Sequence, residues 1–334
     1  MRTTTIRQIS EQEFPGTLPI EEQLRFLLRY AALAPSARNA QPWRLAVDGG
    51  TVRLRADLAH WHPVADPDQR ELYLSLGCAL ENLLVAAEHF GFRHAVAYLP
   101  EPADPTLAAV VCFAPGGSPA PQRAGLALET IVARRTAHGA FADRPVAISE
   151  LRALERGSGD DEVTVRFAEA PGCRQAVETL WATAAERQMA RREYRHELGE
   201  VVGRGDLGTP WPISRLGRLV TASARLARGM ERLERSALRS ARLLALVSTP
   251  GDDHRAHLRS GQVLERLWLT ATALGLGLQP MSAAVEVAEV RGELGAVFGL
   301  PMRFRAQELV RIGRPRGPGG LRTPRRQAGD AART

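Results

Sequence analysis

The residues best suited to chemistry lie in one ten-residue stretch, residues 34–43, which reads APSARNAQPW. Pro35 and Pro42 remove backbone hydrogen-bond donors and fix the turn. Between the prolines, Ser36, Asn39 and Gln41 offer short polar side chains that can bind a ligand at little entropic cost. A turn that only reverses the chain requires Gly or Pro. It does not require a tryptophan or two amide side chains, and this stretch contains both. For this stretch taken alone, an ordinary polar surface loop remains the alternative.

The basic residues limit the possible chemistry. The chain of 334 residues carries a formal net charge of +7, and all 44 of its basic residues are arginine. The absence of lysine excludes a Schiff-base lysine, a P-loop lysine and a kinase-type phosphate lysine. Much of the basic charge lies in the C-terminal tail and in residues 215–242, without interleaved aromatic residues. A basic DNA-binding protein is therefore kept only as a further alternative, and no nucleic-acid partner is expected.

Neither metal binding nor membrane insertion is indicated. Cys78, Cys112 and Cys173 are far apart and form no zinc or disulfide pattern. The histidine pairs in residues 60–62 and 254–257 lack a carboxylate or thiol motif at ligand spacing. No apolar run reaches the roughly 20 residues of a membrane span, and no apolar segment follows the N-terminal charges. We expect a cytoplasmic protein without a metal and without a membrane partner.

The periodicity of the chain predicts alternating helices and strands. Expected helices cover residues 20–33, 72–90, 124–135, 150–155, 174–193, 218–240 and 257–274. Expected strands cover residues 44–47, 51–56, 93–99, 107–115, 163–168, 243–248 and 310–312. Residues 194–217 are polar and rich in Gly and Pro, which predicts a long irregular connection.

An internal repeat organises these elements. Residues 77–91 match residues 261–275 at a constant offset of 184, with identical Gly, Leu, Glu, Leu, Ala and Gly positions. Each copy is a long core helix that ends at a glycine and is flanked by apolar, strand-like runs. We therefore predict two copies of one unit, fused so that they imitate a two-fold dimer. The expected units are residues 1–117 and 118–314, followed by a basic extension, residues 315–334.

The two copies differ in their candidate ligand-binding residues. The Pro-Ser turn occurs only in the first copy, and the stretch Arg134-Arg135-Thr136 stands only before the second. This division predicts one site at the interface between the units rather than two. Residues 190–217 stand roughly where the first copy has its Pro-Ser turn, and they form a possible lid over that site.

Four motifs in order resemble those of the FMN-dependent nitroreductase superfamily, over nearly the whole chain. The turn resembles the family's APS-x-x-N-x-QPW signature, and residues 134–141 resemble its Arg-Arg-Ser/Thr motif. Residues 275–282, GLGLQPMS, resemble the segment whose backbone passes the flavin N5, and residues 311–326 resemble the closing strand and phosphate clamp. Two fused units that share these motifs resemble the Acg-type branch in particular.

The resemblance implies an α+β fold, an α/β/α sandwich of nitroreductase type, with two tandem units and mixed, mainly antiparallel sheets. It also implies FMN as cofactor. The residues expected to bind the flavin are Pro35, Ser36, Asn39, Gln41, Arg134, Arg135, Thr136, His138, Pro280, Met281, Ser282, Arg314 and Arg325. Arginines suit the phosphate because their donors are forked, and Ser36, Asn39 and Thr136 suit the ribityl and phosphate oxygens. His138 stands where the family usually has Lys or Arg, so its charge depends on pH.

The implied activity is ping-pong hydride transfer from NAD(P)H through FMN to a nitroaromatic, quinone or similar acceptor. The cofactor carries this chemistry, so no catalytic side chain is predicted. The alternative is a protein that binds or sequesters FMN without turnover, with residues 190–217 closing the site. The expected state is a monomer with an internal pseudo-dimer, and further dimerisation stays open.

Overall fold

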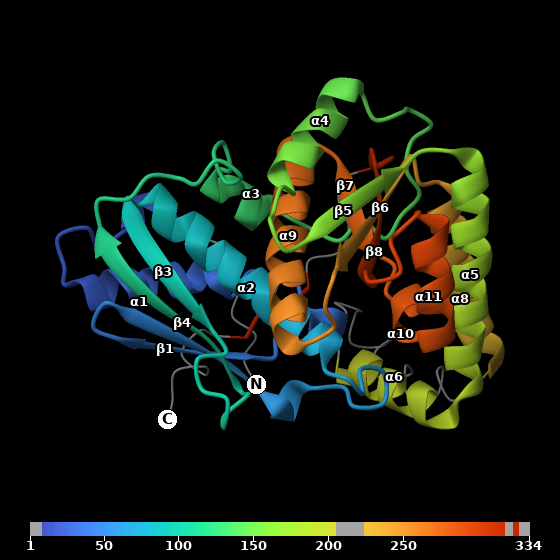
Figure 1. The fold of residues 1–334 in the computed structure, drawn as a ribbon, viewed down its shortest axis with the longest axis horizontal. Helices are drawn as coiled ribbons and strands as arrows, with labels where there is room; N and C mark the ends of the chain where they lie inside the picture. The colour runs from blue at the N-terminus through green and yellow to red at the C-terminus, as the bar shows by residue number, and fades with distance from the viewer. Residues whose placement is uncertain (1–8, 205–223, 318–322, 327–334) are drawn as a thin grey trace.

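The protein contains two four-stranded sheets, one in each half of the chain (Figure 1). The computed structural model describes residues 9–204, 224–317 and 323–326. Figure 1 shows the first sheet with α1 on one side of the molecule and the second sheet with α5, α8, α10 and α11 on the other. Helices α2 and α9 lie between the two sheets. The predicted α+β class is therefore confirmed.

The first sheet comprises β1 (Trp43–Asp48), β2 (Thr51–Ala56), β4 (Leu107–Pro115) and β3 (Phe92–Tyr98), in that spatial order. Strands β1 and β2 form the predicted hairpin, whose turn contains a glycine at positive φ. Alternate residues of β2 are buried, which places one face of the sheet against α1 (Ile20–Ala31) and α2 (Arg70–His89). The other face of the hairpin carries partly exposed arginines.

The second sheet has the same strand order, β5-β6-β8-β7. Its strands are β5 (Thr164–Ala168), β6 (Leu243–Thr249), β7 (Gly277–Pro280) and β8 (Arg305–Gly313). Helix α9 (His254–Ala273) follows the second strand of its sheet as α2 does in the first half. This shared order supports the predicted repeat. The boundary after residue 117 stays a prediction.

Insertions make the second half larger. Helices α5 (Pro171–Ala190), α6 (Arg192–Arg204) and α8 (Ala224–Arg239) separate β5 from β6. Helices α10 (Ala283–Glu286) and α11 (Ala288–Val297) separate β7 from β8. All of β6 is buried, because alternate residues pack toward α9 and toward the inserted helices. The second sheet thus lies between two helical layers.

The two halves meet where α2 crosses α9 at Gly77 and Gly261. A Cβ atom at Gly77 would lie 2.0 Å from the carbonyl oxygen of Leu258, and one at Gly261 would lie 2.0 Å from that of Leu74. Both contacts are impossible for a side chain, so each helix requires glycine at the crossing. The matched glycines of the repeat therefore allow the backbones of α2 and α9 to approach each other closely.

Several expectations about the elements were wrong. Residues 192–204 form helix α6 rather than an irregular connection, while residues 205–217 lie outside the described part. The segment 190–217 follows β5, so its counterpart in the first half is the β1–β2 turn and not the Pro-Ser turn. The sheets are mainly antiparallel, as predicted: all named strand pairs in the described residues are antiparallel, and an isolated parallel bridge joins Thr136 to Leu278. The sequence reading also missed β7, α10 and α11, and it began α4 (Ile148–Gly157) two residues late.

Candidate functional site

The Pro-Ser turn is a strained loop held in place by two serines. Arg38, Asn39 and Gln41 have φ values of 50°, 57° and 51°, in the left-handed region that favours glycine. The hydroxyl of Ser36 accepts a hydrogen bond from the Gln41 backbone at 2.9 Å, and Ser75 on α2 accepts one from the Ala37 backbone at 3.1 Å. Such backbone conformations cost about 1 kcal/mol or more each and tend to occur at functional sites. The turn is therefore a candidate binding loop.

The C-terminal tail lies on this turn. The Asn39 side chain donates a hydrogen bond to the carbonyl oxygen of Pro324 at 3.0 Å and accepts one from Arg325 at 2.6 Å. The Gln41 side chain accepts a hydrogen bond from the backbone N–H of Arg326 at 2.9 Å. The two amides that the sequence singled out therefore hold the tail, and through it they position Arg325.

Arg134 and Arg325 converge on a single carbonyl group. Arg134 donates to the Leu33 oxygen at 3.0 Å and Arg325 donates to the same oxygen at 3.2 Å. Both arginines are buried. Arg134 also lies over the Trp268 ring, 4.7 Å from its centroid, so its guanidinium orientation is fixed. The structure thus brings together the two arginines that the sequence assigned to phosphate binding.

The charge balance at these arginines favours an anion. Arg134 Nε lies 3.4 Å from a carboxylate oxygen of Glu265 and, within the described residues, makes no hydrogen bond. Burial raises the pKa of Glu265 to about 8; Arg134 opposes this shift and the charge of Glu81 adds to it. The carboxyl is therefore largely neutral at pH 7, and it leaves positive charge on Arg134. A buried guanidinium with a donor to spare fits a phosphate group.

Residues 136–138 run beside the start of β7. Thr136 forms a parallel β-bridge with Leu278, and the imidazole Nδ1 of His138 lies 3.3 Å from the side-chain nitrogen of Gln279. Desolvation lowers the pKa of His138, and the charge of Arg311 lowers it further. His138 is therefore neutral at pH 7, unlike the Lys or Arg that the resemblance leads one to expect at this position.

Arg311 supplies a positive charge beside these residues; in the sequence it stands in the closing-strand motif, but it was not among the predicted flavin-binding residues. It is buried on β8 and donates to the Gln279 side chain and to the backbone oxygen of Gly139, both at 2.8 Å. It also lies 4.3 Å from the centroid of the Phe141 ring. Burial lowers its pKa to about 10, so it remains protonated at neutral pH. The sequence did contain a sign of this role, because Arg311 stands among apolar residues in a predicted strand.

The remaining predicted residues lie in different surroundings. Arg314 forms an ion pair with Glu150 on α4 and does not join Arg134 and Arg325. The Arg135 backbone oxygen accepts a hydrogen bond from Trp268. Pro280 ends β7, the Met281 backbone donates to Leu309 at 2.7 Å, and the Ser282 hydroxyl donates to Glu308 at 3.0 Å. The last contact leads to a buried acidic cluster that the sequence did not indicate.

Comparisons with known proteins identify the family to which the chain belongs. The Nitroreductase family model matches residues 131–314. A Mycobacterium tuberculosis (strain H37Rv) protein described as "Putative NAD(P)H nitroreductase" is 32% identical over 314 residues, covering 88% of this chain and 86% of that protein. The "Putative NAD(P)H nitroreductase acg" of the same strain is 28% identical over 312 residues, covering 90% of this chain and 91% of that one. The chain therefore belongs to the nitroreductase family, a family of oxidoreductases.

A solved structure with a similar fold is the FMN-dependent nitroreductase NfnB from Mycobacterium smegmatis in complex with NADPH. It has 16% sequence identity and a TM-score of 0.44, and the match covers 62% of this chain and 96% of that one. In the described part of this chain, no helix combines the length and the apolar character that a membrane span requires.

Proposed function

We propose that the chain binds one FMN between the Pro-Ser turn and residues 134–138, and that it transfers hydride from NAD(P)H to a small acceptor. The acceptor class is a nitroaromatic, a quinone or a similar compound. The observation that carries this proposal is the convergence of Arg134 and Arg325 on the Leu33 carbonyl, beside the strained turn. A bound flavin would accept and return a hydride in two separate half-reactions.

Each part of the site suits one part of FMN. Arg134, whose buried Nε makes no hydrogen bond to any described residue, and Arg325 would hold the dianionic phosphate. Thr136, Ser36 and Asn39 would bind phosphate and ribityl oxygens, and Gln41 would reach polar atoms of the ribityl chain or ring. The backbone N–H of Ser282 would donate to the edge of the ring, because Pro280 has no N–H and the Met281 N–H already donates to Leu309. Arg311 would place a fixed positive charge near Gln279 and His138, where it favours negative charge on a reduced ring.

Purification and flavin release test the proposal. We expect a yellow protein from which denaturation releases FMN. The variant Arg134→Gln should bind FMN at least about 100-fold more weakly, because it loses a charge-assisted phosphate contact in a buried site. Arg187→Gln, an exposed arginine on α5, is the matched control and should bind FMN normally. A colourless protein that cannot be reconstituted with FMN would contradict the proposal.

Helix α6 favours a second candidate function, FMN binding without turnover. The Arg38 side chain donates to the hydroxyl of Tyr194 at 3.0 Å, and the Glu197 carboxylate accepts hydrogen bonds from the backbone of Val64 and Ala65 at 3.1 and 3.0 Å. These contacts tie the inserted helix to the first half of the chain, directly beside the strained turn. A helix held in this way can exclude a nicotinamide donor.

Stopped-flow mixing of the FMN-loaded protein with NADPH or NADH separates the two functions. Fast bleaching of the flavin supports turnover. No bleaching in the wild type, with bleaching restored in Glu197→Ala, supports a closed site. The Glu197 substitution removes the two hydrogen bonds that α6 accepts from the backbone of Val64 and Ala65, and it leaves the proposed flavin ligands in place.

A further inference from the structure

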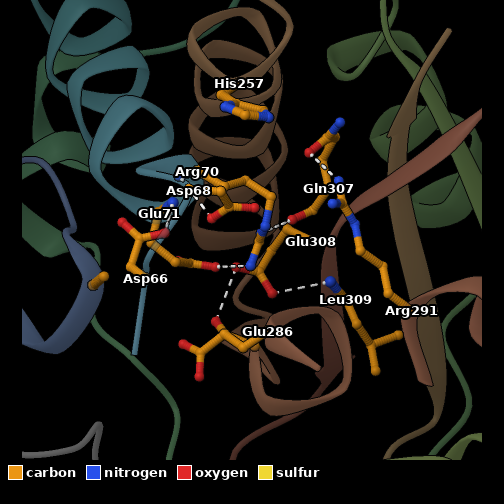
Figure 2. A network of polar contacts seen from close by, with 12 residues as sticks. Asp66, Asp68, Arg70, Glu71, His257, Glu286, Arg291, Gln307, Glu308 and Leu309 are labelled. Atoms are coloured by element: carbon orange, nitrogen blue, oxygen red, sulfur yellow. Dashed lines mark hydrogen bonds and ion pairs between the residues drawn. The ribbon is translucent and has the colours of Figure 1, made fainter. Parts of the chain in front are cut away.

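A cluster of buried acids lies where α2, β8 and α10 meet (Figure 2). Figure 2 shows the side chains of Arg70, Glu71 and Glu308 directed toward one another, with Glu286 close by. Glu71 and Glu308 are almost completely buried, and the Asp66 carboxylate accepts hydrogen bonds from the first turn of α2 at 2.9 Å. Among the described residues, no group of three or more His, Cys, Asp or Glu side chains is arranged to hold a metal ion.

The cluster holds more acids than bases. Four carboxyl groups face two guanidinium groups within the described residues: Asp66, Glu71, Glu286 and Glu308 against Arg38 and Arg70. Arg38 is shared between Glu286 and the Tyr194 hydroxyl, while Arg70 lies 2.9 Å from Glu71 and also donates to the Gln307 backbone. A buried, uncompensated carboxylate costs several kcal/mol, so the cluster must retain protons.

The protons concentrate on the groups deepest in the cluster. Burial raises the pKa of Glu308 well above its ordinary value, and the neighbouring charge of Glu71 adds to this shift. Burial likewise raises the pKa of Glu71, against the opposing charge of Arg70. Burial and then Glu71 raise the pKa of Asp66 to about 7. These shifts favour a cluster that is partly protonated near neutral pH.

A neighbouring ion network does not neutralise Glu308. Asp252 pairs with Arg291 at 2.5 Å and with His257 at 3.2 Å, and Gln307 donates to the same carboxylate at 3.1 Å. Arg291 is therefore committed to Asp252. The other groups that face Glu308 are Arg70 and Glu71 on α2, Glu286 on α10 and the hydroxyl of Ser282. Among these groups only Arg70 is positively charged, and its charge is divided between Glu308 and Glu71.

Ser282 connects this cluster to the proposed flavin site. Its hydroxyl donates to one oxygen of Glu308 at 3.0 Å when that carboxyl group is ionised. When this oxygen carries a proton, the same contact is reversed: Glu308 donates to the Ser282 oxygen, and the Ser282 hydroxyl proton becomes free to point at a bound acceptor. The other oxygen of Glu308 accepts a hydrogen bond from the Leu309 backbone at 3.0 Å. Ser282 itself is half-buried and directly follows Pro280 and Met281. We propose that Glu308 holds a proton at neutral pH and supplies it, through the Ser282 hydroxyl, to the electron acceptor bound beside Ser282. This inference rests on the proposed function.

The proton completes the balance of the acceptor half-reaction. A quinone that takes one hydride becomes a hydroquinone anion and needs one proton to become the hydroquinone. A nitro group that takes one hydride and one proton becomes a nitroso group and releases water. In each case the Ser282 O–H bond breaks as its proton moves to the acceptor oxygen, and a new Ser282 O–H bond forms with the proton of Glu308. Water then reprotonates the cluster.

Infrared spectroscopy tests the protonation of Glu308 without catalysis. We expect the purified protein at pH 7 to show the carbonyl stretch of a protonated carboxyl group, at a higher frequency than the amide band. Glu308→Gln should diminish this band, to which the neutral carboxyl group of Glu265 also contributes. Ser282→Ala should shift the Glu308 component because one hydrogen bond is lost. Glu289→Gln, an exposed glutamate on α11, should leave it unchanged. A band that is absent in the wild type, or unchanged in Glu308→Gln, would overturn the proposal.

Kinetics with two acceptors test proton delivery. In Glu308→Gln, reoxidation of the reduced flavin by a quinone should slow by about 100-fold, the usual size of a lost proton donor. Ferricyanide takes up electrons without protons, so its rate should not change. Equal slowing with both acceptors would indicate a structural role and would overturn the proposal. A protein that binds no flavin would refute the proposed function, while the infrared measurement would still decide the state of Glu308.

Discussion

Glu81 on α2 and Glu265 on α9 occupy equivalent positions in the internal repeat, yet their surroundings differ. Glu81 receives two hydrogen bonds from Arg123, at 2.6 and 3.1 Å, and one from Gln262 at 3.0 Å, and Arg266 lies 3.3 Å away. Glu265 has one ion pair within the described residues, with Arg134 at 3.4 Å. Although burial opposes it, the two arginines lower the pKa of Glu81 to about 2, whereas burial raises that of Glu265 to about 8.

Under the proposed function, this difference explains why a repeated scaffold would carry one flavin site rather than two. Near Glu81, the positive charge of Arg123 is neutralised by two carboxylates of the protein itself. Arg123 pairs with Glu81 and, at 2.8 Å, with Glu88. On the Glu265 side, the carboxyl group can take up a proton, and Arg134 remains available to an external anion. The two halves share a strand order, but carboxylates neutralise Arg123 beside Glu81 and do not neutralise Arg134 beside Glu265. We therefore expect one flavin for each chain.

Removing the two arginines should have unequal effects on stability. Arg123→Gln leaves Glu81 buried without its main partner and should lower the free energy of unfolding by about 3–5 kcal/mol. Arg134→Gln should cost about 1–2 kcal/mol, because Glu265 can be neutral. Urea unfolding of both variants at pH 7 measures the contrast. Equal losses would mean that the two glutamates do not differ as described.

At the helix crossing the two halves should instead behave alike. Gly77→Ala and Gly261→Ala each place a Cβ against a carbonyl oxygen, so each should destabilise the protein by on the order of 3 kcal/mol. Gly292→Ala, on α11, has open space around the new Cβ and should be neutral or stabilising. Thermal unfolding compares the three variants. A tolerated Gly77→Ala would refute the close crossing of α2 and α9.

The pH dependence of stability should have opposite signs for the two glutamates. The raised pKa of Glu265 means that the folded state binds the proton more tightly, so this group lowers stability as pH rises from about 4.5 to about 8. The lowered pKa of Glu81 stabilises the fold above about 4.5, and this contribution is lost as pH falls toward about 2. Glu265→Gln should therefore flatten the decline between pH 5 and 8, by about 3 kcal/mol, because each pKa unit corresponds to about 1.4 kcal/mol.

The control for this experiment is Glu81→Gln, which should destabilise the protein at pH 7 and leave the decline between pH 5 and 8 in place. Urea unfolding across this pH range measures both variants. If Glu265→Gln leaves the pH profile unchanged, Glu265 is ionised in the folded protein.

The smallest expected effect concerns the ring beneath Arg134. Trp268→Phe weakens the cation–π contact and removes the hydrogen bond to the Arg135 backbone. FMN should then bind about threefold to tenfold more weakly, a loss of about 1 kcal/mol. Titration of the apoprotein by flavin fluorescence gives the value. An unchanged affinity would show that Trp268 does not orient Arg134.

The features that depend on local pattern could be predicted. The repeat, its two glycines, the β1–β2 hairpin and the convergence of Arg134 with Arg325 follow from spacing and from family motifs. Helix α6 was missed although Tyr194, Leu198, Val201 and Val202 recur at helical spacing, because the Gly and Pro residues that follow it favoured a loop for the whole segment. Strand β7 was missed because four residues carry little periodicity. The Glu308 cluster could not be predicted, because a charged residue has the same letter whether it is exposed or buried. Its pairing joins segments that are far apart in the chain.

The ratio of FMN to chain tests the central claim most directly. Reconstituted protein should be unfolded, and the released flavin measured against the protein concentration. A ratio of one, lost in Arg134→Gln but kept in the control Arg187→Gln, is the predicted result. A ratio of two would show that both sides of the pseudo-dimer bind flavin, and a ratio of zero would show that neither does. Either result would contradict the asymmetry between Glu81 and Glu265 as the origin of a single site.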